Sequence, residues 1–158
     1  MSSIVLDADA LIKLTHAGIL GNIPHQCFIS DAVFEETVTE GKKRLFDDAF
    51  EIERQVKNGN IDVIKVKRTE DIPGLGKGEL SSLALFKQIK ADAIISDDRR
   101  FLTTLEMQDI PFITPTQVIV TLSKKVGKKE TVAALDRIKP FVTKESYQDA
   151  LSALGDKK

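Results

Sequence analysis

Short apolar runs alternate with longer amphipathic stretches along this chain. The runs are rich in β-branched residues, which predicts strands, and the amphipathic stretches have the spacing of helices. Strands are expected at Ile4–Leu6, Cys27–Ile29, Ile61–Val66, Ala93–Ser96 and Phe112–Ile113. Such alternation predicts an α/β fold with a central, mainly parallel sheet of about five strands and helices on both faces.

The stretches between the strands predict helices. They are expected at Ala8–Leu14, from Ser30-Asp31 to about Glu40, at Leu45–Lys57, Glu79–Lys90 and about Arg99–Gln108, and from Thr114-Pro115 onward. The tail from about Lys128 to Leu154 predicts two more helices, split near Pro140. No repeat or linker interrupts the pattern, so we expect residues 1–158 to form one domain with a helical C-terminal extension at about 128–154.

Composition narrows the class of protein. Of 158 residues, 42% are hydrophobic and 30% charged, an ordinary globular balance that argues against disorder. The formal net charge of −1 excludes a strongly basic nucleic-acid binder but leaves a local basic groove open. The single cysteine, Cys27, allows no internal disulfide and no Cys-based zinc site. Without a signal peptide or an apolar run of about 20 residues, we expect a cytoplasmic protein.

Acidic residues follow two of the expected strands directly. Asp7 and Asp9 come after the first strand, and Asp97 and Asp98 after the fourth. In parallel sheets, sites lie beyond the carboxyl ends of the strands, so these carboxylates converge if the strands are neighbours. Two like charges about 4 Å apart cost roughly 4 kcal/mol at an effective dielectric of about 20, which favours a bound cation. Oxygen ligands without His or Cys suit Mg²⁺ or Mn²⁺.

Each acid also has a purely structural interpretation. An Asp between a strand and a helix is often only an N-cap, which could account for Asp7 and for one member of the Asp97-Asp98 pair. Glu79 opens a helix, where the dipole favours a negative charge, yet it shares a face with the apolar stripe of that helix. On the second helix, Glu35 and Glu36 border the apolar stripe equally well, so periodicity does not choose between them.

Glycine-rich and basic segments add weaker signals. The segment Gly74–Gly78 lacks the P-loop pattern and is interpreted as a flexible turn that lets Glu79 approach. Basic residues occur in several groups, most of which fit a solvated surface. Arg99 and Arg100 differ because they directly follow the acidic pair, where they could hold phosphate oxygens of a nucleic-acid backbone.

Four segments in order resemble the motifs of PIN-domain proteins. Residues 4–12 are similar to the first motif, an apolar strand followed by Asp and a polar residue two further on. Residues 29–36 resemble the second, in which Val is followed three residues later by Glu, and this spacing selects Glu36. Residues 76–85 are similar to the third, G-x-G-E opening a helix. Residues 91–101 resemble the fourth, whose pattern after the strand selects Asp98.

The resemblance implies a single three-layer PIN-like domain and a Mg²⁺- or Mn²⁺-dependent endoribonuclease. Carried onto this chain, the resemblance implies Asp7, Glu79 and Asp98 as the main metal ligands. Glu36 and Asp97 would be ligands directly or through water, with Asp9 in support where many members have Ser, Thr or Asn. Many PIN domains are toxins of toxin–antitoxin pairs, and many PIN domains dimerise. RNA, an antitoxin and a second copy are therefore the expected partners, with the tract from Lys42 to Arg68 as a candidate partner-binding part.

Two other functions compete. Haloacid-dehalogenase-like phosphohydrolases also use D-x-D after the first strand, with the position of Asp7 as covalent nucleophile, but that pattern leaves Glu79 without a role. The other alternative is a non-catalytic PIN-like module that binds RNA or assembles complexes. Against it, no acidic position of the motifs is missing.

Overall fold

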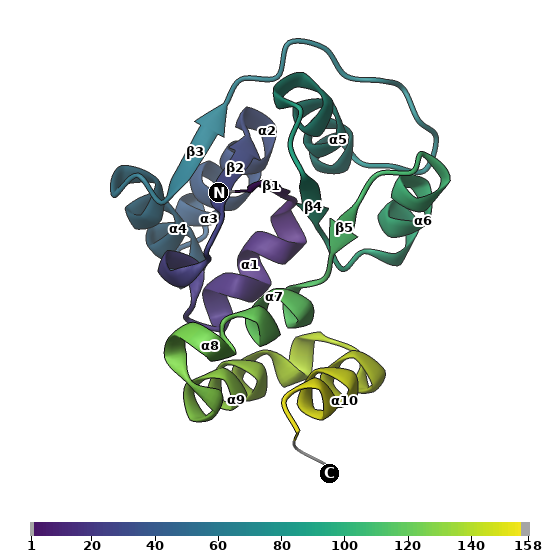
Figure 1. Ribbon diagram of the computed structural model, residues 1–158. Coiled ribbons are helices and arrows are strands. Elements are labelled where there is room, and N and C mark those ends of the chain that lie inside the picture. The colour runs from purple at the N-terminus through teal and green to yellow at the C-terminus, as the bar shows by residue number, and fades with distance from the viewer. Residues whose placement is uncertain (1, 156–158) are drawn as a thin grey trace.

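The computed structural model describes residues 2–155 and shows five parallel strands in the order β3-β2-β1-β4-β5 (Figure 1). Their bounds are β1 (Ser3–Leu6), β2 (Gln26–Ser30), β3 (Ile61–Ile64), β4 (Ala93–Ile95) and β5 (Phe112–Ile113). The central strand β1 pairs with β2 on one side and β4 on the other, with Val5 opposite both Phe28 and Ile94. The predicted α/β class with a parallel central sheet is confirmed.

Helices connect the strands and extend the chain beyond them. The α-helices are α1 (Ala8–His16), α2 (Asp31–Phe34), α3 (Glu40–Lys43), α4 (Asp47–Lys57), α5 (Lys77–Ile89), α6 (Arg99–Met107), α7 (Pro115–Thr121), α8 (Ser123–Val126), α9 (Lys128–Ile138) and α10 (Lys144–Ala153). Short segments of other helical types are η1 (Leu20–Asn22), the π-helical η2 (Glu35–Thr39) and η3 (Lys139–Phe141). None of the helices within residues 2–155 has the length and apolar character that a membrane crossing requires.

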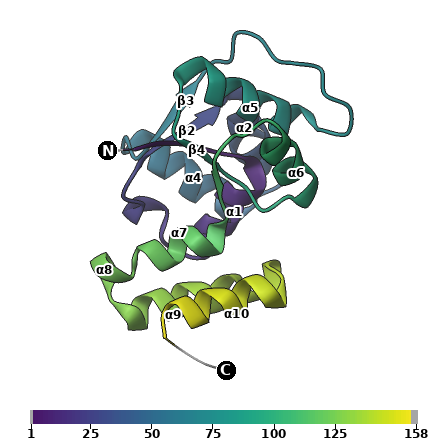
Figure 2. The ribbon, with the colours of Figure 1, turned by 45° about the vertical axis from the view of Figure 1, so that its right-hand side comes forward.

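Alternating residues of β1 build two cores on opposite faces of the sheet. Ile4 and Leu6 pack into one core with residues of α1, α7, α9 and α10. Val5 packs into the other with Leu83 of α5 and Phe101 of α6. Because successive side chains of a strand point to opposite faces, β1 is buried on both sides, as the continuous apolar run predicts. The result is a three-layer arrangement with the sheet in the middle (Figures 1 and 2).

Several elements differ in their bounds from the sequence-based expectation: α4 begins at Asp47 rather than Leu45, and α5 begins at Lys77 rather than Glu79. The third strand ends at Ile64 rather than Val66, because the Val66 N–H donates to the Asp31 carboxylate (3.2 Å) instead of to a neighbouring strand. From there to Gly76 the chain forms a long loop past α5 toward α6 (Figure 1). The second helix is not regular up to Glu40, because the π-helical η2 interrupts it.

Candidate active site

The site lies where the chain changes direction across the sheet. From β1 the chain proceeds outward to β2 and β3, then crosses to β4 on the other side of β1. The crevice beyond the carboxyl ends of the strands at such a switch point is the usual ligand site of an open α/β sheet. The helices α1 and α6 begin there, directly after β1 and β4, and α5 begins beside them.

Asp7 is the most buried acid of the site, with 3% of its surface exposed. One carboxylate oxygen caps α1 by accepting the Ala10 N–H at 2.8 Å, and the other accepts a hydrogen bond from the Ser96 hydroxyl. Burial raises the pKa of Asp7 to about 7, against the opposing effect of these two hydrogen bonds. The negative charges of Asp9 and Glu79 raise the pKa further.

Glu79 is the third residue of α5 and faces the same crevice. Its Oε1 accepts the Gly76 N–H at 2.9 Å, which caps the start of the helix. Its Oε2 is buried and receives no hydrogen bond from an N–H or O–H donor within residues 2–155, while a protonated Glu79 can share its proton with the Asp98 carboxylate. Burial raises the pKa of Glu79, and the carboxylate of Asp98 raises it further, whereas the Gly76 N–H and the charge of Arg100 act in the opposite direction.

Asp98 is tied to Asp7 through a shared serine. The carboxylate of Asp98 caps α6 by accepting the Phe101 N–H at 2.9 Å, and its backbone N–H donates to the Ser96 hydroxyl at 3.2 Å. Because the same hydroxyl donates to Asp7, Ser96 holds the Asp7 carboxylate and the backbone of Asp98 next to each other. The motif of the fourth segment includes this serine, but the sequence alone assigns it no contact.

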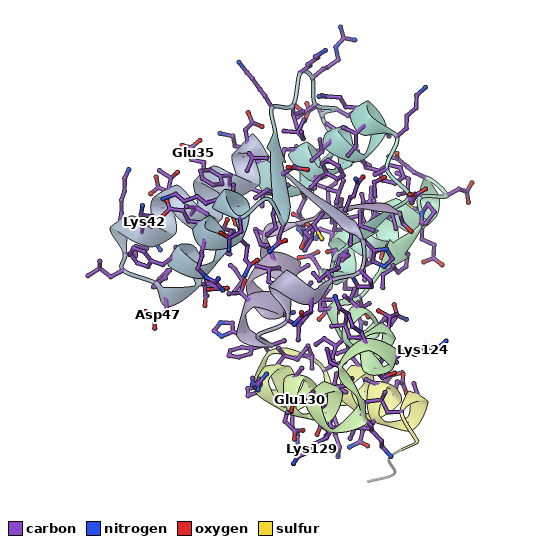
Figure 3. The ribbon with its side chains drawn as sticks, turned by 60° about the vertical axis from the view of Figure 1, so that its left-hand side comes forward. Glu35, Lys42, Asp47, Lys124, Lys129 and Glu130 are labelled. Atoms are coloured by element: carbon purple, nitrogen blue, oxygen red, sulfur yellow. The ribbon has the colours of Figure 1, made fainter. Side chains whose placement is uncertain are left out.

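Glu36 comes to the site from η2. The backbone there makes an i to i+5 hydrogen bond, from the Glu40 N–H to the Glu35 oxygen, which widens the turn. The Glu36 carboxylate lies against Gly78, where a methyl group in place of hydrogen would stand 3.1 Å from its Oε1. Both Glu35 and Glu36 are exposed, and Glu35 lies on the outside of this segment (Figure 3), whereas Glu36 lines the cavity at the start of α5.

One cavity of about 240 Å³ brings five of the expected site acids together. It is lined by Asp7, Asp9, Glu36, Glu79 and Asp98, together with Ala8 and the segment from Gly76 to Gly78. We call it the acidic pocket. Asp7 and Asp98 therefore cap helices and line the pocket at the same time, so the capping interpretation and the functional one do not exclude each other.

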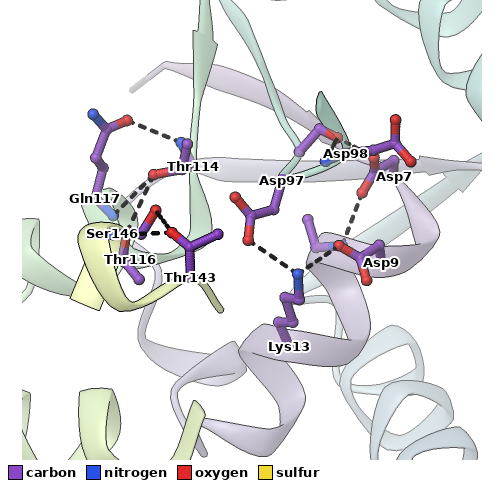
Figure 4. A network of polar contacts seen from close by, with 12 residues as sticks. Asp7, Asp9, Lys13, Asp97, Asp98, Thr114, Thr116, Gln117, Thr143 and Ser146 are labelled. Carbon is purple, nitrogen blue, oxygen red and sulfur yellow. Dashed lines mark hydrogen bonds and ion pairs between the residues drawn. The ribbon is translucent and has the colours of Figure 1, made fainter. Parts of the chain in front are cut away.

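Asp97 is not among the residues that line the acidic pocket. Its carboxylate accepts a hydrogen bond from Lys13 Nζ at 3.0 Å, and the same nitrogen lies 2.9 Å from Asp9 (Figure 4). Burial alone would lower the pKa of Lys13, but Asp9 and Asp97 outweigh it and the pKa lies above its ordinary value. Lys13 was not among the candidate residues, because a lone lysine on an amphipathic helix gives no sequence signal.

Arg99 and Arg100 stand at the rim of the site. They line an adjoining cavity of about 580 Å³ together with Gly74, Glu79 and Asp98, which we call the arginine cavity. Arg100 Nη1 donates to the Gly74 oxygen at 3.1 Å, so it also holds the end of the long loop.

The donor set of the acidic pocket fits a hard divalent cation such as Mg²⁺ or Mn²⁺. All side-chain donors are carboxylate oxygens, and the unpartnered Glu79 Oε2 is a buried acceptor that a cation would satisfy. Within residues 2–155, no three acidic, His or Cys side chains are gathered tightly enough to form a ready-made metal centre.

The fold and the pocket define an α/β protein with a cluster of carboxylates at the carboxyl edge of a parallel sheet. The family model DUF3368, described as a PIN domain, matches residues 3–156, so the chain belongs to the PIN-domain family. This family is of nuclease type and generally depends on divalent metal ions. The haloacid-dehalogenase alternative has no role for Glu79, which the structure places in the acidic pocket.

A solved structure supports the fold. The chain is similar to a PilT N-terminus domain protein from the hyperthermophilic archaeon Sulfolobus solfataricus P2, with a TM-score of 0.56 and 13% sequence identity. The match covers 75% of this chain and 92% of the archaeal one. No curated protein matches this chain in sequence.

Proposed function

We propose that the protein is a metal-dependent endoribonuclease that hydrolyses RNA phosphodiester bonds at the acidic pocket. The observation that carries this proposal is the buried Glu79 Oε2, which receives no hydrogen bond from a donor of the described chain and lies in a cavity that Asp7 and Asp98 also line. A buried acceptor without a partner costs about 1–3 kcal/mol, so its presence is better explained by a ligand than by folding.

The acids have different tasks in this proposal. Asp7, Glu79 and Asp98 would hold the cation, Glu36 would hold it directly or through water, and Asp9 would support them. A divalent ion bound there lowers the pKa of a water molecule and stabilises negative charge on a phosphate. The raised pKa values of Asp7 and Glu79 mean that both carboxyl groups retain protons to a higher pH than usual. Cation binding would therefore release protons.

Other groups of the chain hold the substrate and the ligands. Ser96 orients the Asp7 carboxylate through one hydrogen bond and holds the backbone of Asp98 through the other. Arg99 and Arg100 are placed to bind phosphate oxygens beside the acidic pocket. The resemblance implies Asp97 as a further ligand. In this proposal Asp97 instead pairs with Lys13 and holds that lysine next to Asp9.

The test is cleavage of a panel of labelled RNAs in Mg²⁺, Mn²⁺ or EDTA. Asp98→Asn removes a ligand charge but keeps the N-cap acceptor, so we expect a loss of about 100-fold or more in rate with an unchanged fold. Asp109→Asn is the matched control, since Asp109 is exposed and its positive φ also suits Asn. Full cleavage by a clean Asp98→Asn preparation would refute the proposal.

Metal binding can be measured separately from cleavage. If the folded protein alone binds Mn²⁺, its melting temperature rises as the metal is added. We expect this rise in the wild type and a smaller one in Asp98→Asn. An unchanged melting temperature at millimolar Mn²⁺ would favour the alternative of a non-catalytic PIN-like module.

The toxin role, an antitoxin partner and a homodimer are further proposals from the family resemblance. The turn between α3 and α4 and the first turn of α4 support a partner surface in the Lys42–Arg68 tract, because Leu45 (77% exposed), Phe46 and Phe50 all present apolar surface there. Light scattering on the purified chain tests the dimer. A monomeric mass at micromolar concentration would exclude a stable homodimer.

A further inference from the structure

A second cavity lies beside the acidic pocket, beyond the carboxyl ends of β2 and β3. Its volume is about 440 Å³. It is lined by the start of the long loop (Val66, Lys67, Arg68 and Thr69), the start of α2 (Asp31 and Ala32) and the first turns of α5 (Lys77, Leu80 and Ser81). We call it the loop cavity. Lys77 lines both the loop cavity and the acidic pocket, so the two adjoin.

The loop cavity carries a net positive charge, because three cations, Lys67, Arg68 and Lys77, line it with one acid, Asp31. Lys67, Arg68 and Lys77 are exposed, and none of them has an ion-pair partner in the described part of the chain. The acid that lines the cavity, Asp31, uses one carboxylate oxygen to accept the Val66 N–H. Glu70, two residues after Arg68, pairs instead with Lys87.

The backbone that carries these cations is fastened to the helices beneath it. Besides the bond from Val66 to Asp31, the Lys67 N–H donates to Gln88 Oε1 at 3.0 Å. The amide nitrogen of Gln88 in turn donates to the Lys65 oxygen at 3.1 Å. Since these bonds fix the loop at Lys65–Lys67 against α2 and α5, little backbone ordering remains to be paid for at these residues when an anion binds there.

Cations therefore flank the acidic pocket on two sides. The arginine cavity shares Glu79 and Asp98 with the acidic pocket, and the loop cavity shares Lys77 with it. A flexible single strand can follow three adjoining cavities, which a stiff duplex cannot do. Backbone phosphates on either side of a cleaved bond need cations, because the carboxylates between them repel the strand.

We propose that the loop cavity, through Lys67, Arg68 and Lys77, binds backbone phosphates of single-stranded RNA on the side of the acidic pocket opposite Arg99 and Arg100. This inference rests on the proposed function, because the strand that it positions is the substrate of the acidic pocket. It assigns to the β3–α5 loop the role of holding the strand, without any reading of base sequence.

The test compares two variants that remove the same charge. Lys67→Ala with Arg68→Ala removes two cations of the loop cavity. Lys124→Ala with Lys129→Ala removes two exposed cations of α8 and α9, which lie at the far end of the molecule (Figures 1 and 3). Binding of a fluorescein-labelled oligouridine is measured by anisotropy over a range of salt concentrations in EDTA, so that no cleavage interferes.

We expect the loop-cavity variant to bind roughly tenfold more weakly at about 0.15 M salt. Its plot of log affinity against log salt concentration should be shallower by about 1.4, because each lost phosphate contact on a single strand removes about 0.7. The α8–α9 variant should stay within about twofold of the wild type with an unchanged slope. Lys77→Ala, which removes one contact, should cost about three- to fourfold.

The outcomes separate this inference from the proposed function. Equal affinity of the loop-cavity variant and the α8–α9 variant, in a wild type that cuts RNA, would overturn the inference and leave the nuclease proposal standing. A loss confined to the loop-cavity variant, in a protein that cuts no RNA with any metal, would support the binding site and refute the nuclease. A wild type that binds no oligouridine would overturn the inference outright. Circular dichroism of each variant checks that the fold is intact.

Discussion

Asp7 caps α1 and lines the acidic pocket with one and the same carboxylate, and the two roles have opposite effects on stability. The cap stabilises the helix through the Ala10 N–H. The burial that places Asp7 in the pocket raises its pKa to about 7, so ionising Asp7 in the folded protein lowers the free energy of unfolding. This conflict is typical of a site kept for a ligand, since a bound cation would offset the cost.

Asp7→Asn should therefore stabilise the metal-free protein. The unfolded chain loses the Asp7 proton near pH 3.8, whereas the folded chain keeps it to about pH 7. Between these values the folded state binds more protons, so the free energy of unfolding falls as pH rises. Asn keeps the cap without the charge, and we expect a gain of roughly 1–4 kcal/mol at pH 8 in EDTA.

Denaturant unfolding at pH 4.5 and pH 8 measures this effect. The gain should be small at pH 4.5 and large at pH 8, and Asp109→Asn should show neither. With saturating Mn²⁺ the wild type should recover its stability while Asp7→Asn should not. A variant that is less stable than the wild type at pH 8 would contradict the account of Asp7 as a strained ligand.

Lys13 offers a second prediction at the scale of single residues. Asp97 has only 15% of its side chain exposed and depends on Lys13 for its counter-charge. Lys13→Met should destabilise the protein by about 1–3 kcal/mol, because it leaves a largely buried carboxylate unpaired. Adding Asp97→Asn should recover most of that loss, which a double-mutant cycle from denaturant midpoints measures. Equal and additive losses would show that the pair is not coupled.

Single residues also show which features of the site can be predicted from the sequence and which cannot. The motif spacing selects Glu36 over Glu35, and the structure places Glu36 in the acidic pocket. Asp97 and Asp98 are adjacent and identical in type, yet one pairs with Lys13 and the other lines the pocket. Their roles differ because the backbone turns at the start of α6 and because Lys13, 84 residues away in sequence, contacts only Asp97 of the two. Such a long-range contact cannot be predicted from a local sequence pattern.

At the scale of elements, the positions of the strands follow from the apolar runs, while the ends and irregular turns do not. Val66 is as apolar as the residues of β3, but its N–H bonds to Asp31, and so the strand ends earlier. The π-helical η2 has no sequence signature either. There the Thr37 hydroxyl also bonds back to the Val33 oxygen (2.8 Å), and the widened turn brings Glu36 against the start of α5.

The contact between η2 and α5 gives the third prediction. At Gly78 a Cβ would stand 3.1 Å from Glu36 Oε1, so Gly78→Ala should push that carboxylate aside. Because Ala is more favourable than Gly in a helix by about 1 kcal/mol, the substitution should not lower the stability of the fold. We expect cleavage to fall by roughly 10-fold or more at unchanged or raised melting temperature.

A matched glycine controls for this substitution. At Gly21 a Cβ would stand 3.2 Å from the side-chain oxygen of Gln55, a similar contact outside the acidic pocket. Gly21→Ala should therefore cleave RNA like the wild type. If Gly78→Ala also cleaved normally, Glu36 would not be needed in its present position, and its assignment to the site would fail.

At the scale of the whole molecule, the fold class was predictable because strand and helix periods alternate along the chain. The strand order was not, because it depends on which strands meet across long stretches of chain, such as β1 and β4. The C-terminal extension also joins the rest through long-range contacts. Arg137 Nη1 donates to the Ala17 oxygen at 2.8 Å, and Leu135 and Tyr147 share a core with Leu6 of β1.

This shared core leads to the last prediction, that α9 and α10 unfold together with the sheet. The chain has one tyrosine, Tyr147 in α10, and no tryptophan, so tyrosine fluorescence reports on the extension while far-UV circular dichroism reports on the whole chain. The two denaturation curves should coincide if residues 1–158 form one domain.

Two variants sharpen this test. Leu135→Ala in α9 and Leu105→Ala in α6 each remove a fully buried side chain, on opposite faces of the sheet. Each should cost about 2–5 kcal/mol and shift both curves equally, since a cooperative unit transmits a local loss to every probe. If Leu135→Ala shifted the tyrosine curve alone, the extension would be a separate unit. The acidic pocket would then be built by the first part of the chain without help from its C-terminal helices.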